Sequence, residues 1–218
     1  MTTLVIGCSF SQGSYYPKYD KRKDTKERYL RDSVNTVKGW YNFLDLSDLI
    51  VYGLGSYGYV GYSEIFKTID LSNISNCIIQ ETFEPRIHFV SDLKLSKKKL
   101  GNMTHFTGRG LKNVVHSVPT FDIRNTITGK HIPSVSKCYI ENILEKHNIP
   151  CYTISYREEI KGTGYSKHLC SDLYEKVIRQ KDPSLFSFDF KHDTDPWPHL
   201  SLKGNEFVGN YVKSKLNG

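Results

Sequence analysis

The sequence predicts a three-layer α/β/α sandwich built on a mostly parallel sheet of about five strands. Two patterns lead to this prediction. Short apolar runs of strand length, of which Leu4–Ile6 is the first, recur along the chain. The helical apolar pattern of Ser134–His147 ends at Asn148–Pro150 and leads directly into another strand-like run. Such helix–turn–strand units align parallel strands and place helices on both faces of the sheet. The 218 residues suit one domain over residues 1–218, since no repeat, linker or low-complexity run divides them.

Hydrophobic periodicity assigns the elements in chain order. Apolar runs predict four of the strands, at Leu4–Ile6, Leu49–Tyr52, Cys77–Gln80 and Cys151–Ser155. Helical spacing predicts helices at Tyr62–Ile69, Ser134–His147 and about 202–216. The apolar positions of the second helix are Val135, Tyr139, Ile140, Ile143 and Leu144, and the last helix is expected to bury Phe207, Val208, Tyr211 and Val212.

Two basic segments interrupt the apolar pattern, at about residues 14–38 and 93–113. The first mixes lysine and arginine with acidic residues and tyrosines and has little periodicity. It is expected to be a solvated loop with a short charged helix, or a lid beside the end of the first strand. The second is expected to be a surface insertion or a partner-binding element.

Composition constrains partners and location. The net charge of +7 favours anionic partners such as nucleic acid, polyanionic glycans or phosphorylated substrates, although solubility alone also explains it. The five cysteines form no CxxC pair, which favours a reducing compartment and argues against structural zinc. No cofactor or metal is expected. Neither a signal peptide nor an apolar run of membrane length is visible, so we expect a cytoplasmic protein, in the host cytoplasm if viral, with no membrane partner.

A serine near one end of the chain and a histidine near the other supply the elements of nucleophilic catalysis. Ser9 follows the first strand directly, where α/β sheets expose reactive side chains. His199 would take its proton, and Asp195 would orient the imidazole, with Asp193 as the rival carboxylate.

Simpler roles exist for the same residues. Ser9 would also serve as a helix N-cap, and His199 as a surface imidazole in a proline-rich turn. Cys8 is the weaker candidate nucleophile, because neighbouring side chains of an extended chain point to opposite sides.

These motifs resemble those of the SGNH/GDSL hydrolases, and the end of the third apolar run, with Thr82 and the following Arg86, resembles divergent members from bacteriophages. Residues 5–13 (VIGCSFSQG) are similar to the nucleophile block of that family, with Cys8 in place of the usual Asp. Residues 195–204 (DPWPHLSLKG) are similar to its last block, with one extra residue between Asp and His. Residues 40–58 resemble the block in which a helix leads into a strand and then a glycine loop. The blocks occur in family order over nearly the whole chain.

The resemblance implies a flavodoxin-like sheet with Ser9 as nucleophile. It also implies an oxyanion hole formed by the backbone N–H groups of Ser9 and Gly58, with Gly55 as the fallback for the second donor.

The block after the third apolar run departs from the family pattern. The family has an oxyanion-binding Asn there, whereas this chain has residues 77–86 (CIIQETFEPR). Gln80 or Thr82 would have to supply the third donor. Arg86 would hold a substrate carboxylate or phosphate, or form a structural ion pair. Loss of one oxyanion donor lowers the rate by about two to three orders of magnitude.

Two functions follow from these motifs. The first is a serine ester hydrolase that removes an acyl group, such as acetyl, from a carbohydrate or small metabolite. The second is a catalytically reduced scaffold of the same family that acts as a binding or virion-associated module, with the basic segments as its interface.

Overall fold

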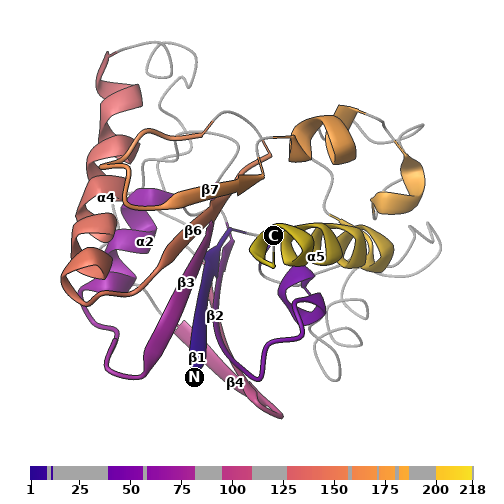
Figure 1. Ribbon diagram of the computed structural model, residues 1–218, viewed down its shortest axis with the longest axis horizontal. Coiled ribbons are helices and arrows are strands. Elements are labelled where there is room, and N and C mark those ends of the chain that lie inside the picture. Colours follow the sequence, from indigo (N-terminus) through magenta and orange to yellow (C-terminus); the bar gives the residue numbers. More distant parts are fainter. Residues whose placement is uncertain are drawn as a thin grey trace.

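The computed structural model describes residues 1–8, 11, 39–55, 58–81, 95–109, 127–156, 159–170, 172–179, 182–186 and 200–217. These residues form an α/β structure around a seven-stranded sheet of order β4-β5-β2-β1-β3-β6-β7 (Figure 1). The strands are β1 (Thr2–Gly7), β2 (Asp48–Gly55), β3 (Ile74–Gln80), β4 (Leu95–Leu100), β5 (Met103–Arg109), β6 (Cys151–Ile154) and β7 (Lys167–Cys170).

The sheet is parallel except at one edge, where β4 pairs antiparallel with β5. Its central order β2-β1-β3-β6-β7 is the flavodoxin-like arrangement, in which the first strand lies between the second and third. The predicted α/β class, the mostly parallel sheet and all four predicted strands are therefore confirmed.

The sheet has more strands than the predicted five because the 93–113 segment supplies β4 and β5. This hairpin extends the sheet beyond β2. Leu95, Lys97 and Lys99 of β4 are exposed, so its sequence lacks the continuous apolar run of a strand buried on both faces. Lysines on an edge strand also oppose pairing with another chain. The other basic segment, residues 14–38, lies outside the described residues.

Helices cover both faces of the sheet. Helices α2 (Tyr59–Phe66) and α4 (Ile127–Lys146) pack together on one side, and α5 (Leu202–Leu216) lies on the other side with the 3-10 helix η1 (Trp40–Phe43) (Figure 1). Short helical turns at Tyr174–Arg179 (η2) and Pro183–Leu185 (η3) lie between β7 and α5 in the chain.

Side chains of the central strands alternate between two buried clusters, one on each face. In β1, Val5 packs with the cluster beneath α5, whereas Leu4 and Ile6 pack with the cluster beneath α2 and α4. The same alternation in β3 sends Ile78 to the α5 face and Ile79 to the α2/α4 face. Burial on both faces explains why these strands are nearly continuous apolar runs.

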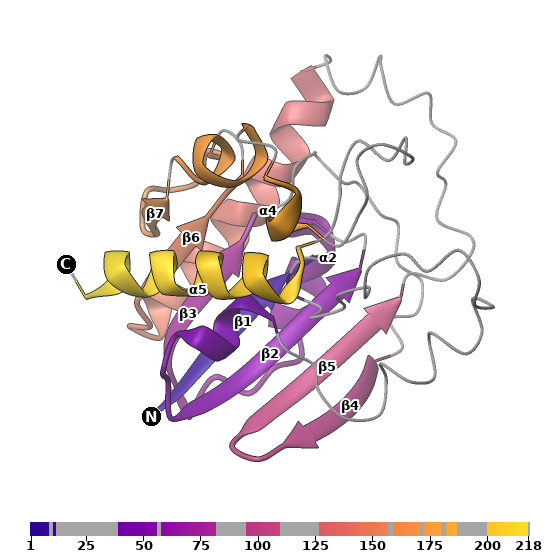
Figure 2. The same ribbon diagram turned by 90° about the vertical axis from the view of Figure 1, so that its right-hand side faces the viewer.

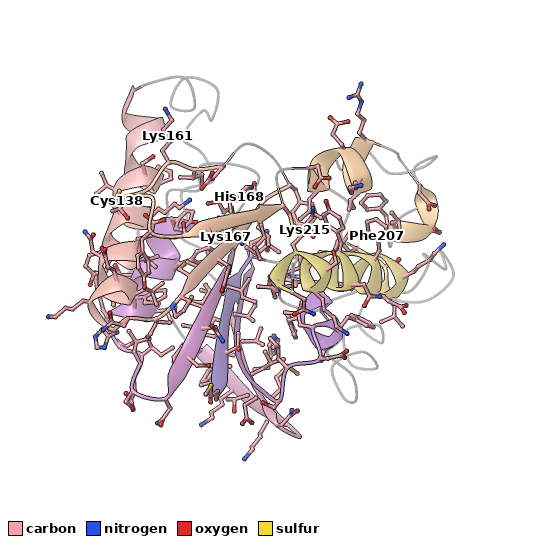
Figure 3. The ribbon with its side chains drawn as sticks, viewed as in Figure 1. Cys138, Lys161, Lys167, His168, Phe207 and Lys215 are labelled. Atoms are coloured by element: carbon pink, nitrogen blue, oxygen red, sulfur yellow. The ribbon has the colours of Figure 1, made fainter. Side chains whose placement is uncertain are left out.

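The predicted burial of Phe207 is wrong, and apolar spacing describes the buried face of α4 only in part. In α5, Val208 and Val212 are buried, but Phe207 is 38 % exposed. Phe207 lies along α5 and its ring stacks on Tyr211 at 6.5 Å (Figure 3). In α4, Ile140 and Leu144 are buried and Val135 is 66 % exposed, and the buried face also carries the charged residues Lys137 and Glu141. Apolar spacing identified only part of this face, because ion pairing allows charged side chains to be buried.

Candidate active site

The predicted site lies where the order of the sheet places ligands in flavodoxin-like folds. Strand β1 lies between the two strands that follow it in the chain, β2 and β3, and open α/β sheets bind ligands outside the carboxyl ends of their strands. Because β1, β2 and β3 are mutually parallel, their carboxyl ends share one edge. Figure 2 shows that α5 begins on the side of the molecule toward which β2 points and ends, at the C-terminus, on the other side.

Gln80, the last residue of β3, ties the end of β1 to the sheet. Its side chain is fully buried. Its Oε1 atom accepts hydrogen bonds from the backbone N–H of Cys8 (3.2 Å), the thiol of Cys8 (3.3 Å) and the hydroxyl of Ser11 (3.1 Å). Its Nε2 atom donates to the carbonyl of Glu81 at 2.6 Å. A backbone N–H can only donate and a carbonyl can only accept, so these partners determine the orientation of the amide.

Gly7 allows this close arrangement. A Cβ atom at Gly7 would overlap the side chain of Ser11 and approach Gln80 Oε1 at 2.8 Å. The backbone N–H of Ser11 also donates to the Cys8 carbonyl at 2.9 Å, which holds the two residues together. The residues on either side of the Ser9–Phe10 dipeptide are thus held in place against β3.

A second contact connects this segment to the helices of the α5 face. The indole N–H of Trp40 donates to Ser11 Oγ at 2.9 Å, and Trp40 is fully buried. A Cβ atom at Gly209 of α5 would overlap the Trp40 carbonyl, so α5 packs directly on η1. Ser11 therefore belongs to a chain of contacts that runs from α5 through Trp40 to Gln80.

Gly58 is the residue immediately before α2 and is buried. Its backbone is extended (φ −128°, ψ −163°), and its carbonyl accepts the first bond of the helix, from the N–H of Tyr62 at 3.0 Å. The first N–H groups of a helix have no partner within the helix, so helix starts are suited to binding anionic oxygens. The predicted donor therefore stands at the start of a helix that follows β2.

The other predicted residues lie outside the described residues: Ser9, Thr82, Arg86, Asp195, its rival Asp193 and His199. Their neighbours Cys8, Glu81 and Leu200 are described, and all three are buried. Leu200 is followed by Ser201, whose hydroxyl caps α5 by accepting from the N–H of Gly204 at 3.0 Å.

A buried charged cluster beside the site was not predicted. The Glu81 carboxylate is fully buried and accepts from the Tyr59 hydroxyl (2.7 Å), from Lys137 Nζ (3.0 Å) and from the backbone N–H of Ile160 (3.1 Å). Lys137, 1 % exposed, also donates to Glu159 (3.2 Å) and to the Ile160 carbonyl (2.6 Å). A sequence signal existed, since Glu81 directly follows a buried strand and Lys137 lies four residues before Glu141 in a helix.

Glu141 completes this cluster from α4. Its carboxylate lies 4.0 Å from Lys137 Nζ and accepts hydrogen bonds from Thr163 and Ser166. Burial alone would raise the pKa of Glu141, but the hydrogen bonds from Ser166 and Thr163 and the charge of Lys137 outweigh it and lower the pKa. Burial likewise works to lower the pKa of Lys137, but Glu81 and Glu159 raise it, so the ammonium stays charged.

Other site types find no support in the part of the chain that the structure describes. Among those residues no three His, Cys, Asp or Glu side chains gather in a way that could hold a metal ion. No described helix is both long enough and apolar enough to span a bilayer. All five cysteines have free thiols.

Comparisons of the chain with protein-family models, with curated proteins and with solved structures find no match.

Proposed function

We propose that the protein is a serine ester hydrolase of the SGNH type, similar to divergent bacteriophage members, whose substrate is an acyl ester of a carbohydrate or small metabolite. The observation that carries the proposal is the position of the first three motif blocks relative to the strands. The segment that contains Ser9 follows β1, Gly58 follows β2, and Gln80 ends β3, so all three belong to one edge of the sheet. The block that contains Asp195 and His199 leads into α5.

The proposed reaction has two steps. Ser9 Oγ attacks the acyl carbon while His199 takes the hydroxyl proton, and His199 then gives that proton to the departing alkoxide. A water molecule, deprotonated by His199, then attacks the acyl carbon. The bond between that carbon and Ser9 Oγ breaks, His199 returns the proton to Oγ, and the acyl group leaves as the carboxylic acid. Asp195 holds the imidazole in the required orientation and stabilises its charged form.

The oxyanion would be bound by the backbone N–H groups of Ser9 and Gly58 together with a third donor. Between the two candidates for this donor, the contacts of Gln80 favour Thr82. Gln80 Nε2 already donates to the Glu81 carbonyl, and Gln80 Oε1 is an acceptor. Gln80 would then act indirectly, by holding Cys8 and Ser11 on either side of the nucleophile segment.

Hydrolysis of p-nitrophenyl acetate tests this proposal. We expect activity in the wild type and a loss of at least about a thousandfold in kcat in Ser9→Ala and in His199→Ala. Ser75→Ala and His147→Ala are matched controls: Ser75 is the second residue of β3, at its amino end, and His147 follows α4. Asp195→Asn and Asp193→Asn decide between the two carboxylates.

One observation favours the binding module as a second candidate. Gln80 ends β3 with its side chain fully buried and one of its two amide hydrogens bonded to the Glu81 carbonyl, which argues against its replacing the family's Asn. Equal ester hydrolysis by the wild type and Ser9→Ala would favour this second function. The next test would then be binding of an anionic polymer to the intact chain.

A further inference from the structure

The Glu81 carboxylate joins the two segments that carry the predicted oxyanion donors. Tyr59 immediately follows Gly58, and its hydroxyl donates to Glu81 Oε1 at 2.7 Å. Glu81 itself stands between Gln80 and Thr82 in the chain. This hydrogen bond links the first residue of α2 to the residue that follows β3.

The carboxylate is held from its other side as well. Lys137 Nζ donates to Glu81, to Glu159 and to the Ile160 carbonyl, which uses all three of its N–H groups. Ile160 returns a backbone N–H to Glu81 Oε2. Because its partners come from α2, from α4 and from the segment between β6 and β7, Glu81 has little freedom to move, and it fixes the position of the Tyr59 hydroxyl.

Backbone contacts strengthen the connection at β3. The N–H of Glu81 donates to the Ile154 carbonyl of β6 at 2.8 Å, and the Tyr62 hydroxyl donates to the Gln80 carbonyl at 3.3 Å. Helix α2 therefore approaches β3 through two tyrosines one turn apart, and Tyr59 is the one next to Gly58. The two rings pack edge to face at 5.8 Å.

We propose that Tyr59 and Glu81 are positioning residues of the oxyanion hole, and that their hydrogen bond sets the separation of Gly58 from the end of β3. This inference rests on the proposed hydrolase function. Neither side chain is proposed to touch substrate. Loss of this positioning should raise the free energy of the transition state, because oxyanion donors must match the developing charge. A misplacement of about 1 Å can lower the rate by about a hundredfold.

The test compares Tyr59→Phe with Tyr165→Phe by steady-state hydrolysis of p-nitrophenyl acetate. Each variant loses one phenolic hydroxyl that donates to a buried acceptor, and each keeps its ring. Tyr165 donates to the Ile149 carbonyl at 3.0 Å, just before β6 and thus near the opposite edge of the sheet. We expect kcat to fall about tenfold or more in Tyr59→Phe with KM unchanged, and both constants to stay at wild-type values in Tyr165→Phe.

A second measurement separates positioning from stability. The rate of Ser9 inactivation by an activated phosphonate should fall in Tyr59→Phe in parallel with kcat, while the melting temperatures of the two variants fall by similar amounts. Equal kcat in Tyr59→Phe and Tyr165→Phe, with an active wild type, would overturn the inference and leave the hydrolase proposal intact. A wild type no more active than Ser9→Ala would instead overturn the hydrolase proposal and this inference with it.

Discussion

Gln80 and Glu81 are consecutive, fully buried polar residues at the end of the same strand, yet they organise opposite faces of the sheet. Gln80 contacts Cys8 and Ser11, and through Ser11 the Trp40 indole beneath α5. Glu81 contacts Tyr59 of α2 and Lys137 of α4. The alternation of a strand explains this division, since successive side chains point to opposite faces.

The two clusters differ in charge, and the difference has energetic consequences. The Gln80 cluster consists of neutral hydrogen bonds, so removal of one member leaves an unpaired polar atom. The Glu81 cluster contains Lys137, Glu141 and Glu159 in addition to Glu81. Removal of its one cation leaves buried carboxylates without a counter-charge. The charged cluster should therefore be the more sensitive of the two.

The largest effect is expected for Lys137→Met. Loss of the ammonium leaves Glu81 buried and uncompensated, which lowers the free energy of unfolding by about 3–5 kcal/mol. Urea denaturation measures this loss. Lys67→Met is the matched control, because Lys67 pairs with Glu64 on the surface and its removal should leave the unfolding midpoint unchanged. A loss for Lys137→Met as small as that of the control would contradict the account of the charged cluster.

A smaller loss is expected for Gly7→Ala, which tests the packing of the neutral cluster. The added methyl group overlaps Ser11 and crowds Gln80, and such overpacking lowers the free energy of unfolding by about 1–3 kcal/mol. Ester hydrolysis should fall as well, because Gly7 and Ser11 lie on either side of Ser9 in the chain. Unchanged stability in urea would show that this segment shifts easily and does not hold the site.

Gln80→Leu should lower the free energy of unfolding by about 1–2 kcal/mol, less than Lys137→Met. It leaves the Cys8 N–H and the Ser11 hydroxyl without their acceptor, but no buried charge remains. Thermal and urea unfolding of both variants under one buffer condition compare the two faces directly. The reverse order of the two losses would refute the distinction between a neutral and a charged cluster.

The smallest effect concerns pH. The pKa of Glu141 is lowered below its ordinary value of 4.5, so its contribution to stability is present above that value and is lost as the pH falls through the folded-state pKa. The pH dependence of the Lys137 contribution is reversed. Because its pKa is raised above the ordinary value of 10.5, its contribution to stability is present below pH 10.5 and is lost as the pH rises through the folded-state pKa. Melting temperatures across the acid range should fall less steeply in Glu141→Gln than in the wild type. Parallel curves would exclude Glu141 as a source of acid sensitivity.

Much of the fold could be predicted from sequence because buried parallel strands are continuous apolar runs. The runs at Leu4–Ile6 and Cys77–Gln80 are of this kind, and both lie within observed strands. The β4 strand could not be found in this way, since its exposed lysines carry no apolar periodicity. The buried face of α4 was identified only in part for a related reason: Lys137 is buried by ion pairing, which periodicity does not detect.

The candidate site was predictable only in part. Gly58 and Gln80 were identified from motif order, and both stand at the carboxyl edge of the sheet. The internal contacts of Gln80, by contrast, depend on the approach of Ser11 to Gly7, which no spacing in the sequence reveals. The roles of Tyr59 and Lys137 likewise follow from the three-dimensional convergence of α2, α4 and β3 on one carboxylate.

The most direct test of the central claim is covalent labelling of the intact chain with a fluorophosphonate, followed by peptide mass spectrometry. We expect one phosphonylated residue, Ser9, with labelling lost in Ser9→Ala and strongly slowed in His199→Ala. No labelling of the folded wild type, or labelling that persists in Ser9→Ala, would contradict the assignment of Ser9 as the nucleophile.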